Sequence, residues 1–372
     1  MPINLLKLPS LVGAMVVTEL DYQEIFLLTL CSRRSLSLVK KARITVPKLT
    51  FRLEKCDAYD SFVIGVKIAM YDWYYVTSVI HVPKLKLGGV ANANPVLDDE
   101  SDIESWYVEV PVYDEKTPDY DEEDPDYDEE DPGHVVASFR HRIKRTSEPM
   151  EVQKETQNHV NSIFHYSGPY KLYLSMECEG QLPNITNVKH IVIEDGTIDE
   201  QFLTKLLTTY PDPHTLESSI VGELPKDSPF FQIQNIAVHS RCGPDYFHNF
   251  AGRHLWLDSV TLTEQDVIMF LRKWITEDAY HNLETAIISV THPLSINADV
   301  IRQAIEFEEY DPNEPEKRPE NYVCAAPFDD FMTIEEFPLR KENVVEVRQV
   351  TDGKRAYLSI DDSRVEFLVH KY

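Results

Sequence analysis

The most constraining feature of this 372-residue chain is its N-terminal segment, residues 5–40, in which three short apolar stretches each follow a helix-capping residue. Ser10 is placed to cap a first helix, and Ser32 is placed to cap a third. Between them, Asp21 with Glu24 three residues later forms the pattern of a capping box, which marks the start of a second helix. The sequence therefore predicts three consecutive short helices.

These three helices carry more apolar side chains than so small a unit can cover. Domains below about 40 residues rarely bury enough surface to be stable without outside help. Two interpretations stay open: an interface for a partner protein, or a helical cap on a larger domain, because apolar residues at helical spacing more often form core. The residues concerned are Leu11, Val12, Met15, Val16, Ile25, Phe26, Leu28, Leu30, Leu36, Leu38 and Val39.

Several residues of this segment resemble the F-box of nematode F-box proteins, namely Leu5, Leu8-Pro9, Val12 and the runs 30–34 and 38–40. In that family the F-box docks on a Skp-type adaptor, which connects it to the cullin of an SCF ubiquitin ligase. The resemblance implies an F-box domain over residues 1–45 that binds such an adaptor. The side chains expected to contact the adaptor are Leu5, Leu8, Pro9, Val12, Val16, Ile25, Leu28, Cys31 and Leu38.

Alternating and β-branched segments replace the helical pattern after residue 43. They predict strands bounded by turn residues. We expect these strands to form a small β-rich linking region, residues 46–97, between the F-box and the rest of the chain. The predicted strands are 44–46, 49–53, 62–66, 74–76 and 80–82.

Acidic residues are concentrated in one segment. Residues 98–131 contain 18 Asp or Glu and one Lys, so they carry −17 of the net charge of −27. Within it the heptapeptide VYDEKTP at 112–118 is followed by two copies of DYDEEDP, which end at Pro132. So polar a stretch cannot bury enough apolar surface to offset its ordering entropy, which predicts a disordered insertion over 98–133. A docking or phosphorylatable acidic tail is the alternative. The basic run 140–145 fits a nuclear signal or local charge compensation.

The C-terminal part of the chain contains an internal echo at an offset of 64 residues. The apolar stretch 170–174 corresponds to 234–238, and the pattern of 191–207 corresponds to that of 255–271. Each copy predicts a short strand, a turn, a Thr-x-x-Glu capping box and an amphipathic helix. The two predicted boxes are Thr197 with Glu200 and Thr261 with Glu264.

Stacked strand-and-helix units of this kind predict a leucine-rich-repeat-like α/β solenoid, with a parallel sheet on one side and helices on the other. A further strand is expected at 286–290, where the echo ends. Chance similarity stays the alternative interpretation. Phe270 and Trp274, four residues apart on the second helix, are expected in its core rather than in a ligand box.

Residues 254–258, the FL..WI pattern within 267–275, and residues 345–356 are similar to parts of the F-box-associated domain, type 2, of the same nematode proteins. The resemblance implies such a domain over residues 134–372, closed by a hairpin. Asp352-Gly353 is expected as its two-residue turn, followed by strands at 357–360 and 367–369.

No Walker loop, GxGxxG, HExxH or GxSxG motif is present, so no catalytic residue or cofactor is assigned. The nearest approach to a metal site is His239, His248 and His254 with Cys242, but its spacing is irregular, and lone histidines more often satisfy ordinary hydrogen bonds. Five cysteines without a CxxC pair argue against a disulfide framework and against structural zinc.

The strongly negative net charge disfavours nucleic acid as a partner, because phosphate contacts need clustered Lys and Arg. No apolar run approaches the ~20 residues of a membrane span, and the N-terminus lacks the features of a secretory signal. We therefore expect no membrane partner and an intracellular location, cytoplasmic, nuclear or both.

Three classes of function follow, and the leading one is the substrate-recognition adaptor of an SCF-type ubiquitin ligase. The second is a non-degradative interaction module that uses the same F-box, and the third, less favoured, is an enzyme of unrecognised type. The target is expected to bind the exposed sheet face and strand-end loops of the C-terminal domain. The acidic side chains Glu308, Glu309 and Asp311 are expected to favour a basic target.

Overall fold

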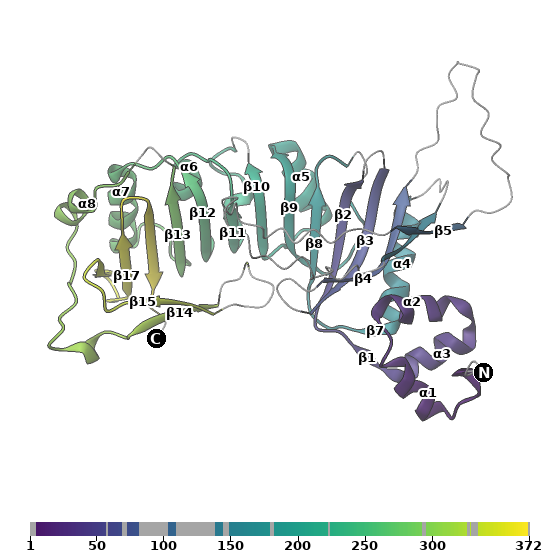
Figure 1. Cartoon of the computed structure of the whole chain (residues 1–372). Coiled ribbons are helices and arrows are strands. Elements are labelled where there is room, and N and C mark those ends of the chain that lie inside the picture. Colours follow the sequence, from purple (N-terminus) through teal and green to yellow (C-terminus); the bar gives the residue numbers. More distant parts are fainter. Residues whose placement is uncertain are drawn as a thin grey trace, which may run out of the picture. The chain divides into compact units, whose positions relative to one another are not determined.

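In the computed structural model the described residues are 5–56, 59–68, 73–81, 103–108, 138–143, 149–178, 182–221, 224–291, 295–325, 328 and 334–370. They fold as a mixed α+β chain, with three N-terminal helices followed by extensive β-structure (Figure 1). The chain divides into unit 1, Met1–Ile68 with Trp73–Ser167, and unit 2, Ala69–Asp72 with Gly168–Tyr372. The predicted boundaries at residues 45, 97 and 133 stay predictions.

Unit 1 begins with the three predicted helices, which are confirmed. Asp21 and Glu24 form the expected capping box, and the Ser32 hydroxyl accepts the N–H of the third residue after it. Ser10 was expected as a cap but is the first helical residue instead, since Pro9 holds the N-cap position and offers no side-chain acceptor. The elements are η1 (Leu5–Lys7), α1 (Ser10–Val17), α2 (Tyr22–Cys31) and α3 (Arg33–Ala42).

The sheet of unit 1 has the strand order β2-β3-β4-β6-β5. The strands predicted at 49–53, 62–66 and 74–82 are confirmed as β2, β3 and β4, which pair antiparallel, whereas β6 runs parallel to β4. A separate parallel pair joins β1 to β7, directly after α4. The bounds are β1 (Ile44–Thr45), β2 (Leu49–Cys56), β3 (Tyr59–Lys67), β4 (Trp73–His81), β5 (Ile103–Val108), β6 (Ser138–Ile143), α4 (Pro149–Ile163) and β7 (Phe164–His165).

Strand β5 falls inside the segment predicted as a disordered insertion, 98–133; the rest of that segment lies outside the described residues. Residues Ile103–Val108 pair antiparallel with β6. Their sequence, IESWYV, is rich in β-branched and aromatic residues, which favour strands even beside an acidic stretch. The prediction of disorder was based on the acidic composition of 98–133 as a whole, and this short strand-forming stretch is an exception within it. Part of the basic run, residues 140–143, lies in β6.

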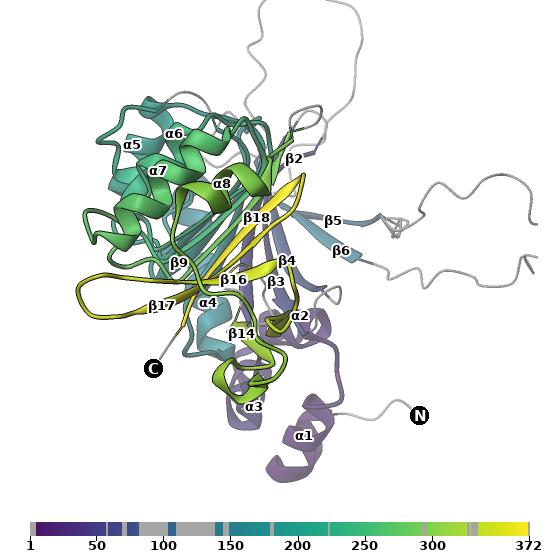
Figure 2. The same cartoon turned by 90° about the vertical axis from the view of Figure 1, so that its left-hand side faces the viewer.

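Unit 2 contains six parallel strands in sequence order, β8 to β13, followed by the antiparallel strands β18, β17 and β16. Helices α5 to α8 lie together on one face of this sheet (Figure 2). The strand predicted at 286–290 is confirmed as β13, and the leucine-rich-repeat-like solenoid stays a prediction. The bounds are β8 (Tyr170–Ser175), β9 (Val188–Ile198), α5 (Glu200–Thr209), β10 (Thr215–Val221), η2 (Pro229–Gln232), β11 (Asn235–Val238), α6 (Asp245–His248), β12 (His254–Val260), α7 (Glu264–Ile275), β13 (Thr285–Val290), α8 (Ala298–Ala304), η3 (Pro315–Lys317), β14 (Asn321–Ala325), β15 (Ile334–Pro338), β16 (Val344–Arg348), β17 (Arg355–Ile360) and β18 (Arg364–Val369).

The core of unit 2 lies between helix α7 and the strands of the sheet. Phe270 and Trp274 of α7 have no exposed surface, which confirms their assignment to the core. Both rings meet Phe367 of β18 edge to face, each with a centroid distance of 5.0 Å. The strands contribute side chains exposed by 2% or less: Leu172, Ile191, Leu216, Ile236, Leu255 and Ile288.

Two local predictions in unit 2 are wrong. Helices α5 and α7 are capped by Asp199 and Thr263, two residues after the predicted Thr197 and Thr261. Strand β9 continues to Ile198, so Thr197 is still in extended ladder structure and the helix begins later. The final hairpin has a longer turn than Asp352-Gly353: the N–H of Gln349 donates to the Lys354 carbonyl, which leaves residues 350–353 as the loop, with Gly353 at φ 72°.

Candidate functional site

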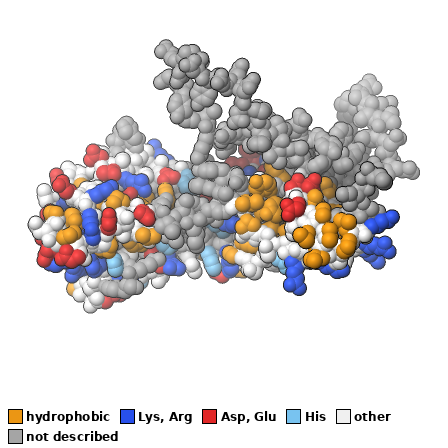
Figure 3. Space-filling view, turned by 60° about the horizontal axis from the view of Figure 1, so that its bottom comes forward, with side chains coloured by type: hydrophobic (Ala, Val, Ile, Leu, Met, Phe, Trp, Pro, Cys, Tyr) orange, Lys and Arg blue, Asp and Glu red, His pale blue; other side chains and the backbone are white. Residues whose placement is uncertain are grey.

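Helix α1 presents most of its large apolar side chains to solvent. Leu11, Met15, Val12 and Val16 are exposed by 73%, 60%, 43% and 39%, and Leu6 of η1 is exposed by 45%. The buried residues of α1 are Gly13 and Val17. We call these five exposed residues the α1 apolar surface; a cluster of hydrophobic side chains is visible over the N-terminal helices (Figure 3). Apolar surface this continuous is typical of an interaction site.

Helix α2 anchors the N-terminal helices to the rest of unit 1. The Thr29 hydroxyl lies 2.7 Å from Nε2 of His159 in α4, and the Phe26 ring meets the His159 ring edge to face. Tyr22 packs edge to face against Tyr74 of β4 and Phe164 of β7. Burial, with a smaller contribution from the charge of Lys40, lowers the pKa of His159, so the neutral imidazole is favoured at this contact.

The predicted adaptor-contacting residues do not share one surface. Pro9, Val12, Val16 and Cys31 are exposed, Leu8 and Leu28 are half-buried, and Leu5 starts η1. Ile25 and Leu38, by contrast, are buried, with exposed fractions of 1% and 9%. They face the interior of unit 1, where α2 packs on α3 and β4, so they position the exposed residues and are not available on the surface.

Leu11, Met15 and Leu6 belong to the exposed surface but were not among the predicted contacts, and Leu30 of α2 is also exposed, by 57%. The signal that could have found two of them is helical spacing, because Leu11 and Met15 are four residues apart, as are Val12 and Val16. These two pairs lie side by side on α1.

The acidic residues predicted to favour a basic target lie beside β16, at the edge of the sheet in unit 2. The backbone of Glu308 pairs with that of Glu346: each N–H donates to the other residue's carbonyl, with N···O distances of 2.8 Å. The Glu308 carboxylate also contacts Arg348 at 2.8 Å. Glu309 and Asp311 are exposed, and the Asp311 carboxylate accepts the N–H of Asn313. Glu308 therefore has a structural role, which separates it from the other two.

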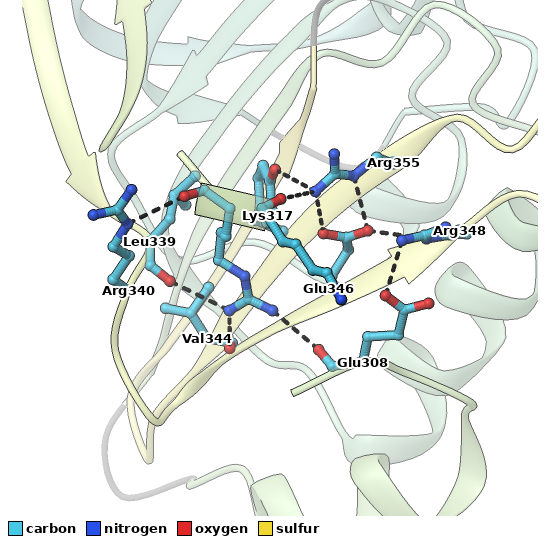
Figure 4. Close-up of polar contacts among 10 residues, drawn as sticks. Glu308, Lys317, Leu339, Arg340, Val344, Glu346, Arg348 and Arg355 are labelled. Carbon is cyan, nitrogen blue, oxygen red and sulfur yellow. Dashed lines mark hydrogen bonds and ion pairs between the residues drawn. The ribbon is translucent and has the colours of Figure 1, made fainter. Parts of the chain in front are cut away.

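A buried ionic cluster closes this edge of the sheet (Figure 4). Glu346 is 3% exposed, and its carboxylate accepts from Nε of Arg348 at 2.9 Å and from Nε of Arg355 at 2.8 Å. Arg318, 5% exposed, donates to the carbonyls of Val344, Glu308 and Leu339. A sheet edge whose backbone groups are occupied in this way is protected from pairing with another chain.

The histidines considered as a metal site are paired separately with carboxylates. His239 Nδ1 lies 2.7 Å from Asp258, and His248 Nε2 lies 3.0 Å from Asp266. Burial raises the pKa of the Cys242 thiol to about 12, so this cysteine stays protonated at neutral pH. Among the described residues, no three His, Cys, Asp or Glu side chains are arranged to hold a metal ion.

Comparisons of the chain with protein-family models, with curated proteins and with solved structures give no match. None of the helices in the described part of the chain has the length and apolar character needed to cross a membrane.

Proposed function

We propose that this chain is a substrate-recognition adaptor of an SCF-type ubiquitin ligase. Its N-terminal helices bind a Skp-type adaptor, and through it a cullin, while unit 2 binds a target protein. The observation that carries the proposal is the α1 apolar surface, which belongs to a three-helix unit whose sequence resembles an F-box.

The energetics support a protein partner for α1. Full burial of one Leu, Val or Met side chain contributes ~1.5–3 kcal/mol relative to exposure, so covering Leu11, Val12, Met15 and Val16 together is a large driving force. Part of it is offset by the loss of freedom on association. Helix α1 packs on α3 and its Val17 is fully buried, so the partner meets a surface that is largely preformed.

Unit 2 offers the second binding surface of the proposal. Glu309 and Asp311 are exposed beside β16 and favour a target with a basic surface, with an association rate that falls as salt rises. Glu308 contributes less to such a contact, because its carboxylate is held by Arg348.

Co-purification with a purified Skp-type adaptor tests the proposal. The double variant Leu11→Asp, Met15→Asp places two charges in the α1 apolar surface, and we expect it to weaken adaptor binding at least tenfold, about 1.4 kcal/mol. Replacing Leu8 and Pro9 by Ala is expected to weaken binding as well. The matched control is Met269→Asp on α7, which is 40% exposed in unit 2 and should leave binding unchanged.

Adaptor binding that survives the double variant would remove the F-box interpretation, and so would a wild-type chain that does not bind. When binding is established, reconstitution with the cullin and ubiquitin-charged enzyme separates the two leading classes of function. Transfer of ubiquitin to a protein bound by unit 2 supports the ligase role. Stable binding without transfer supports the non-degradative interaction module.

A further inference from the structure

Helix α3 has a face that is rich in basic side chains. Arg33, Ser37, Lys40 and Lys41 recur at spacings of four, three and one, which places them on one side of the helix, opposite the buried Leu38. With Leu36 and Arg43 they line an open hollow of 660 Å³. We call these six residues the α3 basic face; Lys and Arg side chains are visible at the margin of the N-terminal helices (Figure 3).

The described residues supply no acidic partner for the cations of this face. Among the described residues, no carboxylate forms an ion pair with Arg33, Lys40, Lys41 or Arg43. Some cations elsewhere in the chain do have such partners, as Arg355 has in Glu346. In a chain with 63 acidic and 36 basic residues, four cations around one hollow, without an ion pair in the described part of the chain, point to an anionic ligand.

We propose that the α3 basic face binds the acidic repeats of the same chain, residues 112–132. This inference does not depend on the proposed function. The heptapeptide DYDEEDP supplies carboxylates for the four cations and a tyrosine ring for the apolar surface of Leu36. A tyrosine ring beside Lys or Arg also gains a cation–π attraction.

The sequence places the repeats within reach of α3. Residues 109–137 connect β5 to β6, and both strands belong to unit 1, as α3 does. A connection of this length extends out and back by about 45 Å, at ~3.3 Å per residue. A compact unit of this size is roughly 40 Å across, so the repeats can extend over a large part of its surface.

Membership of one chain favours this ligand over an external one. A tethered segment has an effective concentration in the millimolar range, so weak ionic contacts suffice to hold it. Nucleic acid and anionic membranes, in contrast, are repelled by the net charge of −27. The contact should weaken with salt, because its charges lie at the surface.

Zero-length carbodiimide cross-linking of the full wild-type chain tests the proposal. The reagent joins lysine amines to carboxylates in direct contact, and mass spectrometry locates the products. We expect cross-links from Lys40 and Lys41 to the repeats, and a decrease of severalfold between about 0.05 and about 0.5 M salt. Lys205, an exposed lysine of α5 in unit 2, is the internal control. Mixing isotopically light and heavy protein separates links within one molecule from links between two.

A second measurement uses the chain without residues 112–132 and a synthetic peptide of residues 119–132. We expect the peptide to bind this chain, and binding to fall at least tenfold in the variant Arg33→Gln, Lys40→Gln, Lys41→Gln. A peptide with every Asp and Glu replaced by Asn and Gln should not bind. Cross-links at Lys40 and Lys41 no more frequent than those at Lys205 would overturn the proposal. Links found only between two molecules would also overturn it, and would assign the face to a second copy.

Discussion

Helix α2 of unit 1 and helix α7 of unit 2 begin in the same way, whereas α1, which has no side-chain cap, differs from α7 in how it is covered. A side-chain capping box starts α2 at Asp21, and another starts α7 at Thr263. Helix α7 then buries Phe270 and Trp274 completely against the sheet. Helix α1 leaves Leu11 and Met15 more than half exposed.

The difference shows that helix formation and helix coverage have separate causes. Caps and apolar spacing are local, and they fix where a helix starts and which face is apolar. Coverage depends on whether another element reaches that face. In unit 2 the parallel strands do so, whereas in unit 1 the elements packed behind α2 and α3 leave the outer face of α1 open. The open apolar face of α1 is the observation on which we base the proposed partner.

The largest expected effect is a loss of stability when the buried helix α7 is changed. Phe270→Ala removes a ring that contacts Phe247, Tyr280 and Phe367, so we expect a loss of ~3–5 kcal/mol in the free energy of unfolding of unit 2. Urea unfolding followed by tryptophan fluorescence measures it. Met269→Ala is the control on the same helix, because Met269 is partly exposed, and we expect a much smaller loss. Equal losses for the two variants would contradict the burial of α7.

A smaller and opposite pair of effects is expected with pH. Burial, with Lys40 adding to it, lowers the pKa of His159 below its unfolded value of about 6.5, so the α2–α4 contact loses stability as pH falls through that value. The hydrogen bond to Asp258 raises the pKa of His239, so its contribution is full below about 6.5 and is lost as pH rises through the raised pKa.

Hydrogen exchange at about pH 5 and about pH 8 checks these signs, after correction for the intrinsic exchange rate. Amides of α2 should be less protected at the lower pH, while amides of β11 and β12 should be better protected. His159→Gln and His239→Gln should each remove one response and leave the other. The same direction of change in both regions of the wild-type chain would contradict the assignment.

The sequence predicted most of the local structure of the chain. Asp21 and Ser32 were correctly identified as caps, whereas Ser10 was not, because Pro9 before it takes the N-cap position. Before α5 and α7, two candidate caps lie two residues apart, and the length of the preceding strand decides between them. That length is set by pairing with a neighbouring strand, which the local pattern does not contain. The same limit applied to the final hairpin, whose register extends the loop beyond Asp352-Gly353.

The candidate sites were less predictable, because they depend on contacts distant in sequence. Ile25 and Val12 are both apolar and at helical spacing, yet Ile25 is buried in α2, which packs on the distant strand β4, whereas Val12 is exposed. Glu308 looks like its neighbour Glu309 in sequence, but Arg348, forty residues away, holds its carboxylate. Periodicity identifies an apolar or charged face and leaves its partner undetermined.

The smallest expected effect is a change in stability when exposed residues of α1 are replaced. Leu11→Ser with Met15→Ser removes apolar area that is already in contact with water, so the free energy of unfolding of unit 1 should change by less than about 0.5 kcal/mol for each site. Phe26→Ala is the matched control, since Phe26 is buried in the next helix, and we expect ~3–5 kcal/mol there. Circular dichroism during urea unfolding measures both. If the double variant were as unstable as Phe26→Ala, the surface of α1 would be packed against the rest of unit 1, and no partner would be needed to cover it.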